Sequence, residues 1–420
     1  MSKRCWSSGA LMAVGAALAL LLLTFVACRA PESAQVTATP TKTPRPLPSL
    51  ATATNTPAPT AAATATSTPT VAPPTQTPVL TPTLSVEPTA TSWPTLAADI
   101  CPLTGLGVSD PALLNRRPLA VKVQNAELAR PQFGLPQADI VYEHLESQAA
   151  YTRFTAIYLC QPVTKVGSVR SARFIDLEIP AMYKSLLAFA GTSPGLYPYF
   201  LNADFKDREF VHPWGWHAEA FYRDMDLYHG GLPIEFTLFA DPVKIWQIAA
   251  QLGINQPQDL SGLTFSPTAP AGGQPAIHIS IPYPTRTMYV DYRYDAAKGV
   301  YLRWNGREPH LDAASGEQLS ATNVIVAYAN HVDADFYEDY PRTKWPSIQI
   351  QLWGTGPMLL FRDGQVYEGL WARPERDDML LLRDPAGQVP IPLKPGNTWI
   401  ELVPLPGYKW SFEATWDAGG

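Results

Sequence analysis

Arginine side chains are the strongest indication of a binding site in the first half of this 420-residue chain. Arg170 and Arg173 lie three residues apart after Gly167, so a short turn would bring two guanidinium groups together. Guanidinium groups bind carboxylate or phosphate oxygens through paired hydrogen bonds. The remaining candidates lie in or beside apolar, strand-like runs: Arg130, Glu143, Arg153, Ser171 and Asp176. The set predicts a pocket for an anionic ligand, such as a cell-wall or teichoic fragment.

The same charges also allow a purely structural interpretation. Glu143 with Arg153, or Asp176 with Arg173, would form internal salt bridges that stabilise the fold. Charged pairs at strand ends often have this role, and perturbed charges alone do not identify a site. Both interpretations are open at the level of the sequence.

A second candidate constellation is His310 with Asp312, in a loop that follows Asn305 and Gly306. An aspartate beside a histidine can orient the imidazole as a general base. Ser171 would then have to provide a nucleophile from the other half of the chain, and no Gly-x-Ser-x-Gly elbow surrounds it. Alternatively, the His and Asp side chains satisfy backbone groups of a hairpin loop.

Metal and cofactor motifs are missing from the sequence. It holds no phosphate-binding glycine loop, no paired-cysteine metal motif and no H-E-x-x-H segment. Two Trp and two His residues do cluster in the 211–217 segment, where Pro213 indicates a loop. Trp rings stack on sugars, so this loop would contact a ligand or else pack on the second half. We predict no metal and no cofactor.

The elements that position these residues divide the chain into two parts. The first part, residues 101–262, reads as a mixed α/β domain. Its strands are predicted at 119–123, 139–143 and 153–159, with a helical segment at 174–187 and a helix from Asp241–Pro242 to about Gly253.

A seam rich in Pro, Gly, Ser and Thr follows at 263–274, and beyond it the pattern becomes β-rich over residues 275–410. Asp363–Gly364 is a hairpin signal between two alternating runs. The expected class is α+β, with a mixed α/β domain followed by a β-rich domain. Strands are predicted at 277–281, 288–294, 301–304, 323–328, 348–353, 358–362, 365–371 and 399–403.

The N-terminus carries a targeting pattern. Lys3 and Arg4 precede an uncharged apolar run at 9–27, which ends in a small residue before Cys28. This resembles a bacterial lipoprotein signal, in which residues 1–27 are removed and Cys28 is acylated. A retained membrane-spanning helix is the alternative. Either way, residues 30–420 would lie outside the cytoplasm at the cell membrane, with the lipid bilayer as a partner through Cys28.

Residues 28–97 are rich in Thr and Pro and carry few charges, a composition that predicts a disordered stalk. The net charge of −6 argues against nucleic acid as a partner, because such binders need a basic surface. Cys101 and Cys160 remain in the folded part. They form either a disulfide that closes a long loop or two separate thiols.

The folded part resembles the YerB-like bacterial lipoproteins, a two-part family of unknown function. The resemblance rests on short stretches spread over nearly all of residues 101–405, and Ala149–Ala150 stands where the family pattern has a glycine pair. It implies an anchored extracytoplasmic protein with two domains and no established reaction. The stretches are 117–121, 125, 129–132, 137–143, 152–154, 166–173, 305–312, 323–326, 354–356 and 395–400.

Together these observations predict a membrane-anchored lipoprotein that binds envelope material or an envelope protein through an Arg-rich cleft. The alternative is a hydrolase that acts on cell-wall carbohydrate or peptide, with Glu143, Ser171, His310 and Asp312 as its best residues. The absence of a complete catalytic motif favours binding.

Overall fold

The structure is a computed structural model that describes residues 96–146, 151–213, 215–338, 341 and 344–419. These residues belong to one compact unit, Ser85–Gly420, which contains far more strand than helix. The predicted signal at 1–27, Cys28 and the predicted stalk up to residue 95 lie outside the described residues. No helix of the described part is long and apolar enough to cross a membrane.

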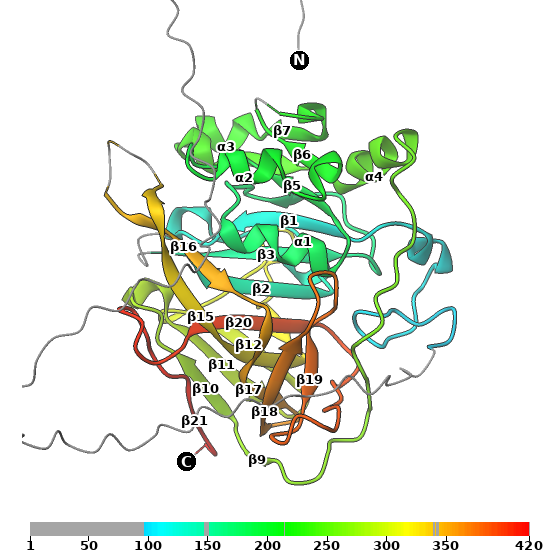
Figure 1. Ribbon diagram of the computed structural model, residues 1–420, viewed down its shortest axis with the longest axis vertical. Helices are drawn as coiled ribbons and strands as arrows, with labels where there is room; N and C mark the ends of the chain where they lie inside the picture. The colour runs from blue at the N-terminus through cyan, green and yellow to red at the C-terminus, as the bar shows by residue number, and fades with distance from the viewer. Residues whose placement is uncertain (1–95, 147–150, 214, 339–340, 342–343, 420) are drawn as a thin grey trace, which may run out of the picture. The chain divides into compact units, whose positions relative to one another are not determined.

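A large mixed sheet forms the centre of this unit (Figure 1). Its strand order is β19-β18-β17-β15-β20-β2-β3-β1-β5-β6, with β16 and β9 paired to β15 and β18. The strands of the first half are β1 (Leu119–Gln124), β2 (Ile140–Leu145), β3 (Thr152–Tyr158), β5 (Leu186–Phe189) and β6 (Glu209–Val211). Those of the second half are β9 (Gln274–Pro275), β15 (Asn323–Tyr337), β16 (Pro346–Gln351), β17 (Gly354–Arg362), β18 (Gln365–Arg373), β19 (Leu381–Arg383) and β20 (Thr398–Pro404).

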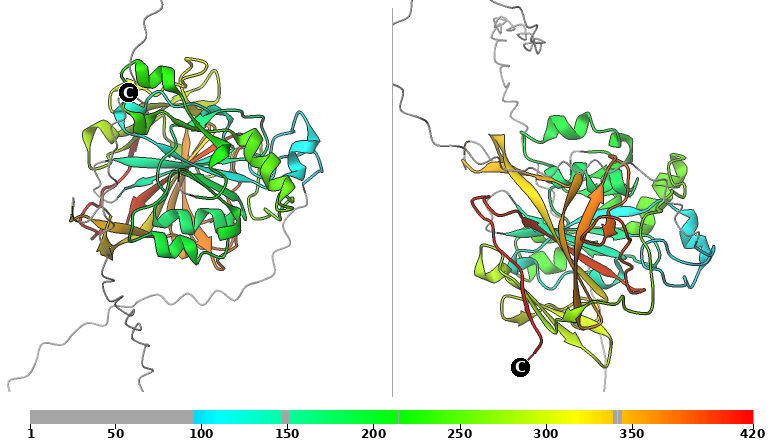
Figure 2. Two further views of the ribbon diagram at one scale, coloured as in Figure 1. Left: turned by 90° about the horizontal axis from the view of Figure 1, so that it is seen from above. Right: turned by 60° about the horizontal axis from the view of Figure 1, so that its bottom comes forward.

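Strand β20 joins the two halves of the chain. It runs parallel to β15 on one side and to β2 on the other, so Ile400 lies between Ile325 and Tyr142. All seven residues of β20 are buried, as expected for a parallel strand covered on both faces. Figure 2 shows the first-half strands and the orange and red second-half strands within one strongly twisted layer. The two halves therefore share one sheet.

The remaining strands form two smaller sheets. The six-stranded sheet comes from the second half and contains β10 (His278–Ile281), β11 (Val290–Asp295), β12 (Val300–Asn305), β13 (Glu308–Pro309), β14 (Ser320–Ala321) and β21 (Thr415–Asp417). The three-stranded sheet comes from the first half and contains β4 (Val166–Gly167), β7 (Phe221–Arg223) and β8 (Leu238–Ala240).

The α-helices within the described residues all belong to the first half; α2, α3 and α4 lie with β5–β7 at the top of Figure 1, whereas α1 is seen lower, near the middle of the view. The longest is α4, which begins as predicted: the Asp241 carboxylate accepts a hydrogen bond from the Lys244 amide at 3.0 Å, and Pro242 follows the cap. The helices are α1 (Ile179–Met182), α2 (Tyr197–Leu201), α3 (Met225–His229) and α4 (Pro242–Gln251).

The predicted helical segment at 174–187 is only partly helical. A 3-10 turn at Phe174–Leu177 and the short helix α1 occupy its first part, but Leu186 and Leu187 begin strand β5. Strand β5 pairs in parallel with β1, and all four of its residues are buried. A short, fully apolar strand has no period that distinguishes it from a buried helix, which explains the error.

Cys101 and Cys160 form a disulfide, which settles the question that the sequence left open. Asp139 lies beside it and accepts hydrogen bonds from the Leu159 and Cys160 amides at 2.6 and 3.0 Å. The bond ties the segment before β1 to the end of β3, at a sequence separation of 59.

Candidate binding groove

A groove of about 870 Å³ lies where the first half meets the six-stranded sheet. Both halves line it, and we call it the inter-half groove. Its volume is within the range of small-molecule sites in proteins. The lining residues are Glu127, Arg130 and Pro131 from the first half, and Arg286, Thr287, Tyr289, Asp291 and residues 305–311 from the second.

Arg130 links the groove to the protein interior. Its Nε donates to Asn125 Oδ1 at 3.1 Å, and its Nη2 donates to the carbonyl oxygens of Asn125 and Thr287 at 2.8 and 3.2 Å. Burial lowers the pKa of Arg130 to about 10, so the guanidinium remains charged at neutral pH. A fixed positive charge therefore lies at the base of the groove and contacts both halves.

His310 is the second lining residue that belongs to the interior, where it is only 2% exposed. Arg303 Nε donates to His310 Nδ1 at 3.0 Å, so Nε2 carries the proton in this network and donates to Gln132 Oε1 at 2.7 Å. Burial, and then the charges of Arg303 and Arg130, hold the pKa of His310 well below its usual range. The imidazole is neutral and both of its nitrogens are occupied.

Beneath these residues, Arg303 lies between two buried carboxyl groups. Its Nη2 contacts Glu143 Oε2 at 2.5 Å, and its Nη1 lies 3.5 Å from Glu401 Oε1. All three side chains are fully buried. Burial raises the pKa of Glu143 to about 8, and the charge of Glu401 adds to the shift while Arg303 opposes it. One guanidinium thus serves two carboxyl groups, and burial favours the protonated form of Glu143.

Neighbouring donors satisfy the remaining carboxyl oxygens. Tyr292 and Tyr283 donate to the two oxygens of Glu401 at 2.7 and 3.0 Å. Asn125 Nδ2 donates to Glu143 Oε1 at 3.0 Å, and Thr152 Oγ1 donates to the same oxygen. Direct hydrogen bonds and ion pairs between side chains therefore form a buried polar network that connects the two halves.

Strand registry explains why these residues meet. Glu143 on β2 is paired directly with Glu401 on β20, and Tyr292 on β11 is paired with Arg303 on β12. Because side chains alternate between the two faces of a strand, paired residues point to the same face. The six-stranded sheet therefore covers the Glu143 face of the large sheet.

The opposite face carries a different buried cluster. Lys122 Nζ lies 2.8 Å from Asp176 Oδ2 with both side chains fully buried, and it also donates to Thr155 Oγ1 at 2.9 Å and to His144 Nε2. Burial lowers the pKa of Lys122 to about 8. Burial and the charge of Lys122 hold the pKa of His144 well below its usual range. Lys122 and His144 thus face away from the six-stranded sheet, whereas Glu143, the residue before His144, faces it. This is the alternation of side chains expected along a strand.

The residues proposed from the sequence are therefore distributed over both faces. The structure brings Arg130, Glu143 and His310 together at or beneath the inter-half groove. It brings the remaining arginines and Ser171 together on the opposite face, where Arg153 Nη1 donates to the Ser171 carbonyl oxygen at 2.7 Å and Arg173 lies close by. The single cleft containing all of these residues is replaced by two separate clusters.

The individual pairings suggested by the sequence are not the ones that form. Glu143 pairs with Arg303 rather than Arg153, because Glu143 and Arg153 are at alternate positions of their ladder and face opposite sides. Asp176 accepts from the Arg173 backbone amide at 2.7 Å, and its ionic partner is Lys122. The expectation of internal salt bridges holds, but with different partners.

Asp312 does not orient His310. Its Oδ2 accepts hydrogen bonds from the Ala314 and Ser315 amides at 3.1 and 2.9 Å and so stabilises a turn. The two nitrogens of His310 contact Arg303, Asn305 and Gln132 instead. The alternative in which the loop side chains satisfy backbone groups therefore holds for Asp312 but not for His310.

The aromatic loop at 211–217 can be described only in part, because Trp214 lies outside the described residues. Trp216 is 68% exposed, and the His217 ring contacts the Phe210 ring at a centroid distance of 5.1 Å. The two histidines share no contact in the described part of the chain.

Sequence reasoning missed Arg303, Glu401 and Lys122. A signal was present, since each is a charged residue inside a run that was otherwise predicted to be a strand. Charged residues that are buried in a strand must find a partner, so such positions predict an internal network.

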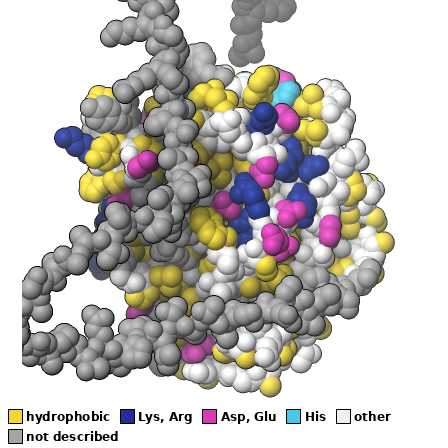
Figure 3. Space-filling view, in the orientation of Figure 1, with side chains coloured by type: hydrophobic (Ala, Val, Ile, Leu, Met, Phe, Trp, Pro, Cys, Tyr) yellow, Lys and Arg dark blue, Asp and Glu magenta, His cyan; other side chains and the backbone are white. Residues whose placement is uncertain are grey.

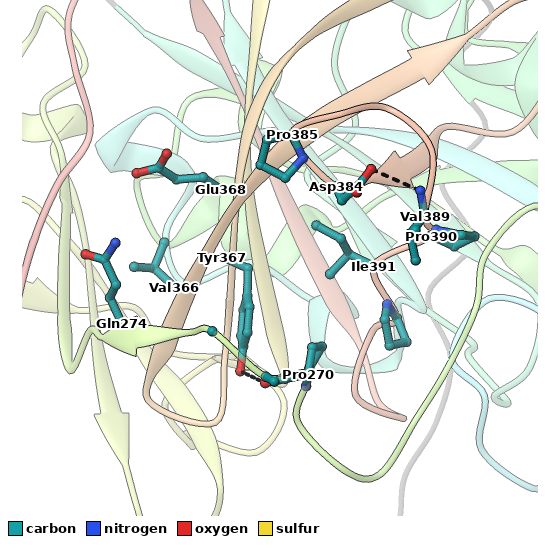
Figure 4. Close-up of a pocket in the computed structure, with 13 residues that line it drawn as sticks. Pro270, Gln274, Val366, Tyr367, Glu368, Asp384, Pro385, Val389, Pro390 and Ile391 are labelled. Atoms are coloured by element: carbon teal, nitrogen blue, oxygen red, sulfur yellow. Dashed lines mark hydrogen bonds between the residues drawn. The ribbon is translucent and has the colours of Figure 1, made fainter.

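A second depression, of about 510 Å³, lies beside β18 and β19 and is shown in Figure 4. Its polar groups hold its own walls together: Tyr367 donates to the Pro270 carbonyl oxygen at 3.0 Å, and Asp384 accepts from the Val389 amide at 3.0 Å. Prolines and aliphatic side chains form much of the remaining lining. The depression therefore offers fewer free polar groups than the inter-half groove.

The charges on the face seen in Figure 3 are of both signs and lie close together. Ion pairs of this kind link Arg376 to Glu178 at 3.1 Å and to Asp204 at 2.8 Å. Exposed pairs contribute little stability, typically below about 1 kcal/mol each. The view gives no sign of a continuous basic surface on the described part of this face.

The comparisons with known proteins agree with the fold and its two-part sequence. The model described as "Protein of unknown function (DUF3048) N-terminal domain" matches residues 103–253, and its C-terminal counterpart matches residues 279–400. "Putative lipoprotein YerB" of Bacillus subtilis (strain 168) is 30% identical over 321 residues, which cover 72% of this chain and 86% of that protein. The crystal structure of Bacillus subtilis YerB has a TM-score of 0.60 and 26% identity, and the match covers 75% of this chain and 98% of that one. The chain therefore belongs to the YerB-like family of two-part proteins of unknown function.

Proposed function

We propose that this protein is a lipid-anchored, extracytoplasmic binding protein that holds envelope material in the inter-half groove. The anchor is Cys28, by analogy with the lipoprotein relative and from the signal-like segment before it. The observation that carries the binding proposal is the groove itself: it is lined by a half-buried guanidinium, Arg130, and its rim contains further charges.

The rim indicates what kind of ligand fits. Arg286 and Arg307 are exposed and form no ion pair within the described part of the chain. Glu127 and Glu308 are exposed on the same rim. A ligand that carries both carboxylate and amino groups matches this mixture better than a purely anionic polymer. Peptide-bearing wall fragments have that chemistry, so they are the class of envelope material we propose.

Binding of soluble wall fragments to the full-length protein in neutral detergent tests the proposal. The probe is a set of disaccharide–peptides released from purified cell wall, measured by titration calorimetry. The double variant Arg286→Gln, Arg307→Gln should bind at least about tenfold more weakly, because two charge-assisted contacts are lost. Arg293→Gln, an exposed arginine stacked on Trp304 outside the groove, is the matched control. Equal affinities in all three proteins would refute the groove as the site.

The second candidate function is a hydrolase of wall carbohydrate or peptide. The observation in its favour is the carboxyl pair Glu143 and Glu401, because a carboxyl with a pKa of about 8 can act as a general acid near neutral pH. Both side chains are fully buried beneath Asn305 and His310, so a bound ligand would not touch them. Mass spectrometry of the bound fragments separates the two functions: unchanged masses support binding, and shortened products support hydrolysis.

The anchor is tested separately by the mass of the mature N-terminus. We expect the chain to begin at Cys28 with acyl groups attached, and Cys28→Ser to release the protein from the membrane fraction. A mature chain that begins at Met1 would contradict the lipid anchor and favour the retained helix.

A further inference from the structure

The face of the large sheet opposite the inter-half groove carries three arginines that share one small volume. Arg153 is on β3, while Arg170 and Arg173 belong to the segment that leads from β4 to the 3-10 turn at Phe174–Leu177. Backbone bonds fix that segment, since the Arg170 amide donates to the Lys122 carbonyl at 3.0 Å and the Ala190 amide donates to the Arg170 carbonyl at 2.9 Å. Hydrogen bonds to its neighbours therefore hold this segment in place, although residues 170–173 belong to no helix or strand.

The positive charge in this cluster is not balanced by its carboxylates. Glu146 contacts Arg153 Nη2 at 2.6 Å and Arg173 Nη2 at 3.6 Å, and Glu338 lies 3.6 Å from Arg173 Nε. Arg170 has no carboxylate partner among the described residues; its Nη1 reaches only the Glu235 carbonyl oxygen at 3.4 Å. Two carboxylates thus face three guanidinium groups, and the nearby Lys122 is already paired with Asp176.

The pKa shifts in this cluster have the direction that neighbouring positive charges produce. Burial lowers the pKa of Arg153 to about 9, and the charges of Arg173 and Arg170 lower it further while Glu146 opposes them. Burial alone would raise the pKa of Glu146, but Arg153, Arg173 and Arg170 outweigh it and the pKa falls below its usual range. An added anion would relieve this repulsion.

Unused hydrogen-bond donors are the second, independent observation. Arg153 is 4% exposed, yet its Nε has no hydrogen-bond partner. The Nε atoms of Arg170 and Arg173 are likewise buried without one, and so are the oxygens Glu146 Oε2 and Glu338 Oε2 in the same cluster. Buried donors without an acceptor are costly, by about 1–3 kcal/mol each, and native proteins rarely leave several together.

We propose that Arg153, Arg170 and Arg173 form a binding site for a phosphate group. A carboxylate needs only one guanidinium fork, and Glu146 and Glu338 already supply two carboxylates here. A tetrahedral phosphate offers four oxygens in different directions, which suits donors that come from three separate arginines. Arg170 is the partly exposed member through which the ligand enters. The site is on the other face of the sheet from the inter-half groove, so it does not depend on the function proposed above.

Titration of the full-length protein in neutral detergent with inorganic phosphate tests this inference, with thermal unfolding and calorimetry as readouts. Phosphate should raise the unfolding temperature more than chloride does at equal ionic strength. Arg170→Gln should weaken phosphate binding at least about tenfold. Arg170→Lys should bind phosphate with an affinity between those of the wild type and Arg170→Gln, because the positive charge remains but the two-pronged guanidinium is lost. Arg223→Gln is the matched control, since Arg223 is near Arg170 but bonds only to the Ile234 carbonyl oxygen.

Arg170 makes no ion pair in the described part of the chain, so its removal should leave the fold intact; circular dichroism checks this. Two further probes distinguish the source of the phosphate: glycerophosphoglycerol, and a short-chain phosphatidylglycerol with the same headgroup. Equal affinity for the two supports a soluble phosphate polymer, and tighter binding of the acylated probe supports a lipid headgroup. If all three phosphate probes act no more strongly than chloride, or if Arg170→Gln binds phosphate as the wild type does, the site is refuted.

Discussion

Replacement of Glu143 by Gln tests whether this carboxyl group keeps a proton inside the folded protein. Gln has a similar shape but cannot titrate. Its single carbonyl oxygen can accept from Asn125 or from Arg303 but not from both, so the comparison rests on pH dependence and not on absolute stability. The pKa of Glu143 rises from its ordinary value of 4.5 to about 8 in the fold, chiefly through burial. Glu143 therefore binds its proton more tightly in the folded chain than in the unfolded one.

The sign of the pH effect follows directly. This contribution to stability is complete below about pH 4.5 and is lost as the pH rises through 8. Each pH unit within that window removes about 1.4 kcal/mol. Between pH 5 and pH 8 the wild type should lose about 3–4 kcal/mol of unfolding free energy that the Glu143→Gln variant does not lose.

Urea denaturation at pH 5, 6.5 and 8, followed by Trp fluorescence, measures the difference between the two proteins at each pH. Other titrating groups are common to both proteins and cancel in that difference. Glu127→Gln, an exposed carboxylate on the groove rim, is the control and should follow the wild type. If the wild type and Glu143→Gln change in parallel from pH 5 to pH 8, Glu143 does not hold a proton in the fold and the reasoning fails.

Two further predictions concern stability. Arg303→Met leaves Glu143 and Glu401 without their shared cation and should cost about 3–5 kcal/mol of unfolding free energy, measured by urea titration. The control Arg293→Met, at an exposed arginine, should cost less than about 1 kcal/mol. Equal losses in the two variants would contradict the buried network. The double variant Cys101→Ala, Cys160→Ala opens a 59-residue loop and should cost about 4 kcal/mol in the chain-entropy model. Reduction of the wild type should lower its unfolding midpoint to that of the double variant, and an unchanged midpoint on reduction would argue against the bond.

Local structure was largely predictable from the sequence, because alternating apolar residues and turn signals are local. The strands at 119–123, 139–143 and 153–159 were predicted within two residues at each end, and the Asp363–Gly364 hairpin, in which both residues have positive φ, was also predicted. The helix beginning at Pro242 was found from its cap and its proline. Segment 174–187 was misassigned because Leu186 and Leu187 lie in a strand too short and too apolar to show a period.

Long-range pairing was not predictable in the same way. A strand pattern shows which residues share a face, but it does not show which strand lies alongside. Nothing local to Trp399 or Glu401 indicates that β20 pairs with β2 of the other half. For this reason Arg130, Glu143 and His310 were recognised individually, whereas their connecting residue Arg303 was missed. For the same reason the sequence predicted one cleft containing Arg153 and Glu143, although their adjacent positions in the β2–β3 ladder place them on opposite faces of the sheet.

The position of β20 has a consequence for how the chain acquires its fold. The strand that separates β15 from β2 is β20, which comes after every other described strand of the large sheet along the chain. During synthesis, the edges of β2 and β15 therefore remain unpaired until Thr398–Pro404 has been made. Such late, non-local pairing is slow and leaves strand edges open to other chains. Formation of the continuous sheet therefore depends on β20, and a variant truncated before Thr398 would have two exposed sheet edges in its place.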